Sequence, residues 1–191
     1  AFFNILSEES CGGKVLFNPI LNIKLPNVHA HTKKTPIIPD DILIFLDNHI
    51  NEIRQEDIIL MYNLLMETGW RFGDMLALTA DCASPDKTNP EIANIWVSSP
   101  KTKQSRVKRR LGDAFEDVIS IELYHQMQEF IESSRTIRDA YHINTLFFNL
   151  TNGVASTYDS SKFNKSINKL CKKHGITSID ERFWQLSTRQ T

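Results

Sequence analysis

Arg71 is the first of several cations in this sequence whose types and spacing could serve phosphate chemistry. It follows Gly69, which ends a predicted helix, and it stands where a second amphipathic turn begins. Unpaired backbone N–H groups make a helix start electropositive, so an arginine there is unfavourable unless an anion compensates for it. A phosphate would do so, because the guanidinium fork matches phosphate geometry. The alternative is a local salt bridge between Arg71 and Asp74, one turn later.

A second group of cations follows a predicted strand over residues 92–98. Six of the ten residues from 101 to 110 are Lys or Arg. We expect a hairpin with its tip near 103–105 and a return strand over 106–111, and a further strand can form at 118–121. The run could be only a solvated face, but phosphate contact is favoured because the rest of the chain is net acidic. The candidate phosphate contacts in this run are Lys103, Arg106 and Lys108.

A third basic surface is predicted on a helix near the end of the sequence. Its apolar positions Phe163, Ile167 and Leu170 recur at helical spacing, and Gly175 ends it. Lysines near a helix C-terminus are also ordinary partners of the helix dipole, so both interpretations stay open. The flank consists of Lys162, Lys165, Lys169, Lys172 and Lys173, of which Lys162 and Lys165 are the candidate phosphate contacts.

The composition indicates a globular protein without a bulk charge signal. The 191 residues are 41% hydrophobic, and 22 Lys plus Arg against 23 Asp plus Glu give a net charge of −1. The three cysteines lack CxxC spacing, which argues against a disulfide framework or a zinc site and favours a reducing cytosol. No apolar run approaches the roughly 20 residues that span a bilayer. We therefore expect a soluble intracellular protein.

Several familiar catalytic motifs are absent from the sequence. It contains no Gly-rich phosphate loop, no HExxH and no GxSxG, and its six histidines include no helical pair at ligand spacing. We therefore predict no metal and no cofactor. Fixed cations can stabilise a phosphoryl transition state without a metal, because the charge develops on the equatorial oxygens that they meet.

The elements that must position these cations are mainly helices. A short helix can form over residues 1–10, and Gly12 and Gly13 break it. Prolines then keep the chain extended to about residue 39, as a linker or as a mildly basic arm along a partner. Helices are predicted from Asp40 to about Ile53 and from Glu56 to Gly69, the second of them apolar nearly all round and therefore central. We expect a further helix over 122–138, a buried run at 146–148 and a polar loop over 149–160. The predicted fold class is α+β, mainly α: a helical bundle with a small antiparallel three-stranded sheet.

Three segments together resemble the tyrosine recombinases, or phage-type integrases. Residues 68–78 read TGWRFGDMLAL, which is similar to the family's arginine box TGxRxxExxxL, with Asp74 where Glu is commoner. Residues 99–106 read SPKTKQSR and resemble the hairpin that carries the catalytic lysine. Residues 18–26 look like the linker from the N-terminal DNA-binding domain. The resemblance implies that 1–39 end that domain and form the linker, and that 40–191 belong to the catalytic domain.

The resemblance also implies a reaction and roles for individual residues. A tyrosine would attack the scissile phosphate and form a 3′-phosphotyrosyl bond, without metal or ATP. Arg71 would hold the nonbridging oxygens, and Asp74 would orient Arg71. Lys101, or alternatively Lys103, would protonate the departing 5′-oxygen. The implied partner is double-stranded DNA, bound by a homotetramer of the full-length protein in the cytoplasm of a bacterium, on its nucleoid.

The end of the sequence departs from the family pattern. The family has a HxxR segment, and residues 183–191, FWQLSTRQT, look like the approach to it. Arg189 stands where His is usual; if Arg189 were instead the second arginine, Leu186 would occupy the acid/base position. The four tyrosines, Tyr62, Tyr124, Tyr141 and Tyr158, lie outside the nucleophile's context. We therefore expect an inactive fragment, truncated before the second arginine and the nucleophile.

Two other interpretations remain open. One is a catalytically dead DNA-binding or architectural module of the same fold. The other is a helical protein-interaction domain whose arginine box is coincidental, and this one predicts no DNA binding.

Overall fold

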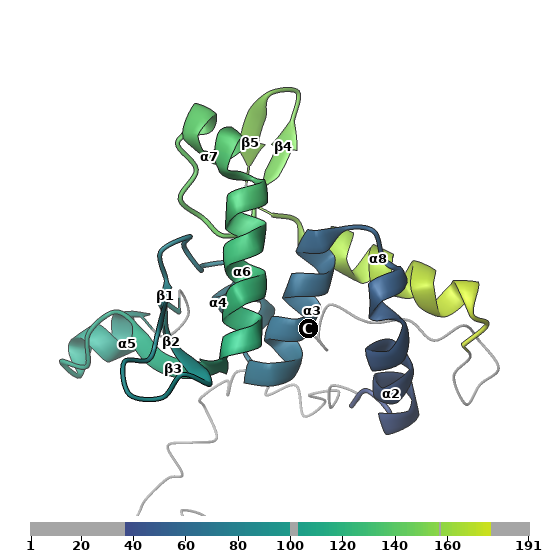
Figure 1. Cartoon of the computed structure of the whole chain (residues 1–191), viewed down its shortest axis with the longest axis horizontal. Coiled ribbons are helices and arrows are strands. Elements are labelled where there is room, and N and C mark those ends of the chain that lie inside the picture. The colour runs from purple at the N-terminus through teal and green to yellow at the C-terminus, as the bar shows by residue number, and fades with distance from the viewer. Residues whose placement is uncertain (1–36, 100–102, 157, 177–191) are drawn as a thin grey trace, which may run out of the picture. The chain divides into compact units, whose positions relative to one another are not determined.

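The computed structural model describes residues 37–99, 103–156 and 158–176. Residues 1–36 of the predicted linker, Lys101 and Arg189 lie outside these residues. Within them helical segments come first, and strands and helices are interspersed from β1 onward (Figure 1). In chain order they are α2 (Asp40–His49), the 3-10 helix η2 (Ile50–Glu52), α3 (Glu56–Thr68), α4 (Phe72–Met75), β1 (Ala83–Pro85), β2 (Ile92–Val97), α5 (Lys103–Lys108), β3 (Phe115–Ser120), α6 (Ile121–Ser133), α7 (Arg135–Tyr141), β4 (Asn149–Thr151), β5 (Val154–Ser156) and α8 (Ser160–Lys173).

The helix α3 lies at the centre of the core, as its apolar sequence predicts. Ile58, Met61 and Leu64 are fully buried in it, and α3 packs beside α6 (Figure 1). Gly69 ends α3 in the left-handed conformation (φ 65°), with its N–H bonded to the Leu65 carbonyl at 2.9 Å. Because glycine has no Cβ, it adopts this conformation without steric strain, and the chain can turn sharply toward Arg71.

The three-stranded antiparallel sheet has the order β1-β2-β3, and it contacts α6. Its core face carries Ala93, Ile95 and Val97 from β2 and Ile119 from β3, all almost completely buried. The predicted fold class is thus confirmed: the described residues are mainly helical, with one small antiparallel three-stranded sheet.

The predicted return strand over residues 106–111 is wrong. Residues 103–108 form the helix α5, and the strand that pairs with β2 is β3, with Val97 opposite Phe115. Lys, Gln and Arg are good helix formers, and the run has no alternation of apolar residues that would give it a buried strand face. The strand expected at 118–121 overlaps β3, so the hairpin exists with a longer connection.

Two further elements differ from the prediction. The helix expected over 122–138 is two helices, broken at Ser134, whose hydroxyl donates to the carbonyls of Phe130 (2.8 Å) and Ile131 (3.1 Å). A serine that bonds the preceding turn in this way competes with helix propagation. The loop expected over 149–160 contains the β4–β5 hairpin, whose turn residues Asn152 and Gly153 both have positive φ. Asn-Gly is the usual sequence of such a turn.

The buried run at 146–148 packs where predicted. Leu146 and Phe147 are buried, and the Leu146 N–H donates to the Leu78 carbonyl at 2.7 Å. A bridge between Thr79 and Thr145 continues this pairing. The segment that follows α4 is therefore held against the chain that leads to β4. In the part of the chain that the structure describes, no helix is long and apolar enough to cross a membrane.

Candidate nucleic-acid interface

Arg71 is an exposed residue at the start of a single helical turn. It is the N-cap of α4, with extended backbone angles (φ −71°, ψ 144°), and its carbonyl accepts from the N–H groups of Asp74 (2.9 Å) and Met75 (3.2 Å). The next residue, Phe72, is buried, and its ring lies 5.3 Å from the ring of Phe163 on α8. The backbone of Arg71 is thus fixed from both sides, while its side chain faces solvent.

Trp70 joins this segment to the sheet. Its indole N–H donates to Asp117 Oδ2 on β3 at 2.8 Å, and its ring meets Phe115 edge to face at 6.2 Å. The Thr68 hydroxyl closes the end of α3 by donating to the Leu64 carbonyl at 2.6 Å. These contacts hold the arginine box on rigid structure, which a binding site for a small anion requires.

Asp74 is buried and makes a contact that the sequence did not indicate. Its Oδ1 accepts from the hydroxyl of Ser99 at 2.6 Å, and both residues are almost fully buried. The local salt bridge between Arg71 and Asp74 is not formed; among the described residues, no ion pair involves either of them. Ser99 lies two residues before Lys101, so the hydrogen bond ties α4 to the point where the chain leaves toward that lysine.

The three cations predicted on the hairpin differ in the contacts that their side chains make. Lys103 lies 3.5 Å from Asp113 in an exposed ion pair, and Lys108 is exposed. Arg106 donates to the carbonyls of Leu111 (3.1 Å) and Ala114 (2.7 Å). Its guanidinium therefore orders the connection from α5 to β3, which leaves Lys103 and Lys108 as the better-placed phosphate contacts.

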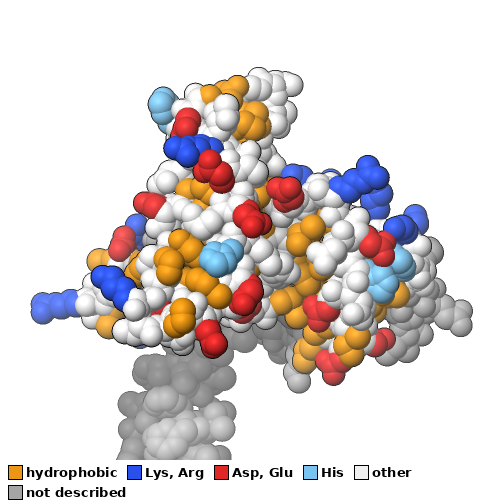
Figure 2. All heavy atoms as spheres, viewed as in Figure 1, with side chains coloured by type: hydrophobic (Ala, Val, Ile, Leu, Met, Phe, Trp, Pro, Cys, Tyr) orange, Lys and Arg blue, Asp and Glu red, His pale blue; other side chains and the backbone are white. Residues whose placement is uncertain are grey.

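The two cations predicted on α8 also differ. Lys162 pairs with Asp57 of α3 at 2.6 Å and lies over the ring of Tyr158 at 5.0 Å. Lys165 is exposed on the same helix. Figure 2 shows Lys and Arg side chains gathered over α5 at one edge of the view and along α8 at the opposite edge. The basic surfaces are thus two separate regions of the described chain.

Comparison with known proteins gives a match among solved structures. No protein-family model matches the sequence, and no curated protein does. A crystal structure of the XerH site-specific recombinase, bound to a palindromic difH substrate in a post-cleavage complex, matches with a TM-score of 0.53 at 15% sequence identity. The match covers 87% of this chain and 41% of the recombinase chain, so this chain spans about two fifths of that protein's length.

The fold is that of a tyrosine recombinase catalytic domain. At this low identity the likeness concerns the fold and leaves the roles of single residues as predictions. The roles of Arg71, Asp74, Lys101, Lys103 and Arg189 are of this kind.

The four tyrosines differ in their surroundings. The hydroxyl of Tyr62 donates to Asp47 at 2.7 Å, and that of Tyr158 donates to Asp57 at 2.9 Å. Burial raises the pKa of both phenols, and the carboxylates raise it further. Tyr124 is half-buried on α6, and Tyr141 is exposed at the end of α7.

Sequence reasoning missed two groups of functional interest. Arg138 is buried and organises the chain around Leu146, although its sequence context gives no sign of burial. His49, Glu52 and His174 converge from different elements, and their ligand atoms all lie within 4.8 Å of one another. The histidines are 125 residues apart in sequence, so helical spacing could not reveal this group.

Proposed function

We propose that this chain is part of the catalytic domain of a site-specific tyrosine recombinase and that it binds double-stranded DNA with its basic surfaces. The observation that carries the proposal is Arg71: an exposed arginine fixed by buried neighbours, with no ion pair among the described residues, in a chain with the recombinase fold. A guanidinium on a fixed backbone and without an ion pair can bind a phosphate with two hydrogen bonds.

In the full-length recombinase, Arg71 holds the nonbridging oxygens of the scissile phosphate and Lys101 protonates the leaving 5′-oxygen. The buried Asp74 supports the turn that carries Arg71, and the hydrogen bond from Ser99 fixes its carboxylate there. The acting form is a homotetramer on DNA, in the bacterial cytoplasm. The chain alone binds DNA without cutting it, because Tyr62 and Tyr158 are buried and hydrogen-bonded to carboxylates, and Tyr124 and Tyr141 lie outside the sequence context of the nucleophile.

The first test is binding to a fluorescently labelled duplex, followed by anisotropy at increasing salt. Counterion release makes such binding salt-sensitive, with the affinity falling as phosphate contacts are screened. Replacing both Lys103 and Lys108 with alanine is expected to weaken binding and to lower the slope of log K against log salt by about 2, one for each phosphate contact. Lys87→Ala removes an exposed lysine from the β1–β2 connection and serves as the control.

Arg106→Ala is a poorer probe of DNA contact, because it would also release the α5–β3 connection. Equal binding by the wild type and the Lys103/Lys108 double variant would count against the α5 surface. No binding at low salt by the wild type would favour a protein-interaction domain instead.

A second test addresses the chemistry. In the full-length protein, a nicked duplex that loses its 5′ fragment should trap a covalent protein–DNA adduct, and Arg71→Ala should abolish it. DNA binding without any adduct in the full-length wild type would favour a catalytically dead module of the same fold.

A further inference from the structure

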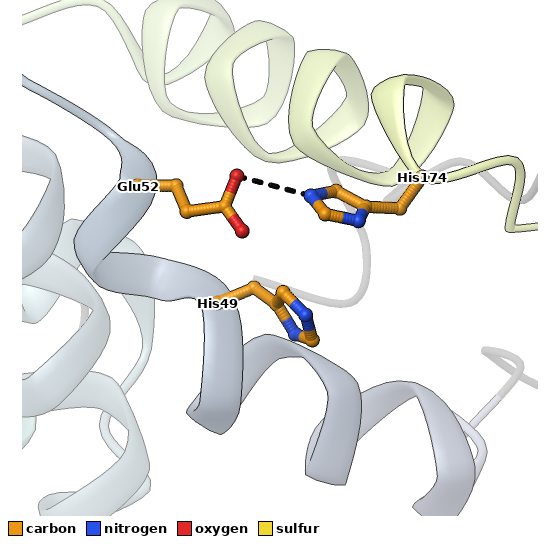
Figure 3. A group of neighbouring side chains, drawn as sticks. All are labelled: His49, Glu52 and His174. Atoms are coloured by element: carbon orange, nitrogen blue, oxygen red, sulfur yellow. Dashed lines mark hydrogen bonds and ion pairs between the residues drawn. The ribbon is translucent and has the colours of Figure 1, made fainter.

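The side chains of His49, Glu52 and His174 form a compact group of metal-ligating atoms away from the arginine box. His49 ends α2, Glu52 ends η2, and His174 is the C-cap of α8. Figure 3 shows the three side chains converging between the α2–η2 segment and the end of α8. One atom from each of the three lies within 4.8 Å of the other two.

The His49 ring is oriented so that its Nε2 can bind a metal ion. Its Nδ1 lies 2.8 Å from the Phe45 carbonyl, which can only accept, so this nitrogen carries the proton and the neutral ring leaves the Nε2 lone pair free. A hydrogen bond from the second nitrogen to a carbonyl is the usual support of a metal-bound histidine. Phe45 stacks on His49 at 4.4 Å and meets the edge of His174 at 5.3 Å, so one aromatic side chain holds both imidazoles.

Glu52 supplies a carboxylate to the group. It accepts hydrogen bonds from Lys173 and His174, and its side chain is partly exposed. Both partners contact Oε2, and His174 Nε2 lies 3.0 Å from it. Lys173 is 64% exposed, so its ammonium can turn into solvent when another cation takes the carboxylate.

We propose that His49 Nε2, Glu52 and His174 Nε2 bind one zinc ion. On binding, His174 gives up its hydrogen bond to Glu52 and ligates as the neutral ring protonated at Nδ1, and any excess proton passes to solvent. Two imidazoles and one carboxylate are an established zinc ligand set, which leaves a fourth tetrahedral position for water. The hard cations Mg²⁺ and Ca²⁺ prefer sets made of oxygen alone, and imidazole selects against them. At zinc–ligand distances of about 2.1 Å, tetrahedral ligands lie roughly 3.4 Å apart. The partly exposed side chains of Glu52 and His174 reach that spacing by small rotations.

The ion would fasten the end of α8 to the α2–η2 segment. In the described chain this junction includes ring contacts of His174 with Phe45 and His49 and the ion pairs of Glu52 with Lys173 and His174, which are partly exposed and therefore weak. A ligand that binds only the folded arrangement stabilises it by mass action, so zinc should raise the melting temperature. This inference is independent of the proposed DNA function.

The test is equilibrium binding of Zn²⁺ by the 191-residue chain, measured by calorimetry, with Co²⁺ absorption as a report of tetrahedral coordination. One equivalent is expected, together with a rise in melting temperature. His49→Gln and His174→Gln should each weaken binding at least tenfold and abolish the thermal shift. His125→Gln removes an exposed histidine of α6 and should change neither. Lys173→Ala should tighten binding, because it removes the competing cation.

Circular dichroism of the metal-free variants separates loss of ligation from loss of folding, and Glu52→Gln gives a second variant of nearly unchanged shape. Absence of stoichiometric binding by the wild type would overturn the proposal. Binding that survives the combined His49→Gln and His174→Gln substitution would also overturn it, because the ion would then lie elsewhere.

Discussion

Replacement of the buried Arg138 with methionine should destabilise the fold strongly. Arg138 lies on α7 and is only 6% exposed. Its Nε donates to the Ser134 hydroxyl at 2.7 Å, and its two terminal nitrogens donate to the carbonyls of Thr145 (2.7 Å) and Leu146 (2.5 Å). The guanidinium also lies over the ring of Phe148 at 5.0 Å. One side chain thus joins the break after α6 to the buried run that precedes β4.

The expected cost follows from these contacts. Methionine keeps most of the apolar stem but leaves the Leu146 carbonyl buried without its donor, and an unsatisfied buried group costs about 1–3 kcal/mol. The other two hydrogen bonds add to this loss. Burial disfavours the charged guanidinium and lowers the pKa of Arg138, so removing the charge returns part of the cost. We expect a net loss of about 2–4 kcal/mol in the free energy of unfolding.

The assay is equilibrium unfolding in urea, with the midpoint and the slope fitted separately. Arg135→Met is the matched control on the same helix, because Arg135 makes only exposed ion pairs with Glu132 and Asp139. The control should change stability by less than about 0.5 kcal/mol. If Arg138→Met were no more destabilising than Arg135→Met, the hydrogen bonds of Arg138 would not be what holds this junction.

Three smaller predictions follow from other positions. Gly69→Ala should lower the free energy of unfolding in urea by about 1–2 kcal/mol, because the backbone there has a φ of 65°. An added Cβ would meet nothing within 4 Å, so the cost comes from the backbone alone. An unchanged urea midpoint would show that the turn relaxes freely. Asp74→Ala should cost about 1–3 kcal/mol, because it leaves the buried Ser99 hydroxyl without its acceptor, and restoration of stability by the added change Ser99→Ala would support this cause. Burial raises the pKa of the Cys82 thiol to about 12 and that of Cys171 to about 11, so both stay protonated in the fold. Both thiols should resist iodoacetamide at pH 8.5 until urea is added. The free energy of unfolding should fall as the pH rises above the ordinary pKa of a thiol, because there only the unfolded chain ionises. Rapid labelling of the native protein, detected by peptide mapping, would contradict the burial of these cysteines.

Much of the fold could be predicted because its signals are local. The helix α3 is defined by acids in its first turn, a continuous apolar run and a glycine stop, and all three lie within 14 residues of the printed sequence. The turn sequence Asn152-Gly153 was an equally local signal, but the polar composition around it led to the prediction of a loop over 149–160, and the β4–β5 hairpin was missed. A periodic signal that ends in a clear stop is therefore predicted more safely than a short hairpin within polar sequence.

The site could be predicted less completely because its contacts are distant in sequence. The bond between Asp74 and Ser99 spans 25 positions, and it replaces the salt bridge that the spacing of Arg71 and Asp74 suggested. Arg106 looked like a surface cation, but the connection folds back so that its guanidinium meets backbone carbonyls. Charge in a sequence shows where cations are, and only packing decides which of them remain free.

The most direct test of the central claim is the contribution of Arg71 to DNA binding. We would measure the affinity of the 191-residue chain for a labelled duplex at several salt concentrations, for the wild type, Arg71→Ala and the control Arg135→Ala. If Arg71 holds a phosphate, its loss should weaken binding about tenfold and lower the salt slope by about 1, whereas the control should change little. Unchanged affinity and slope in Arg71→Ala would contradict the account.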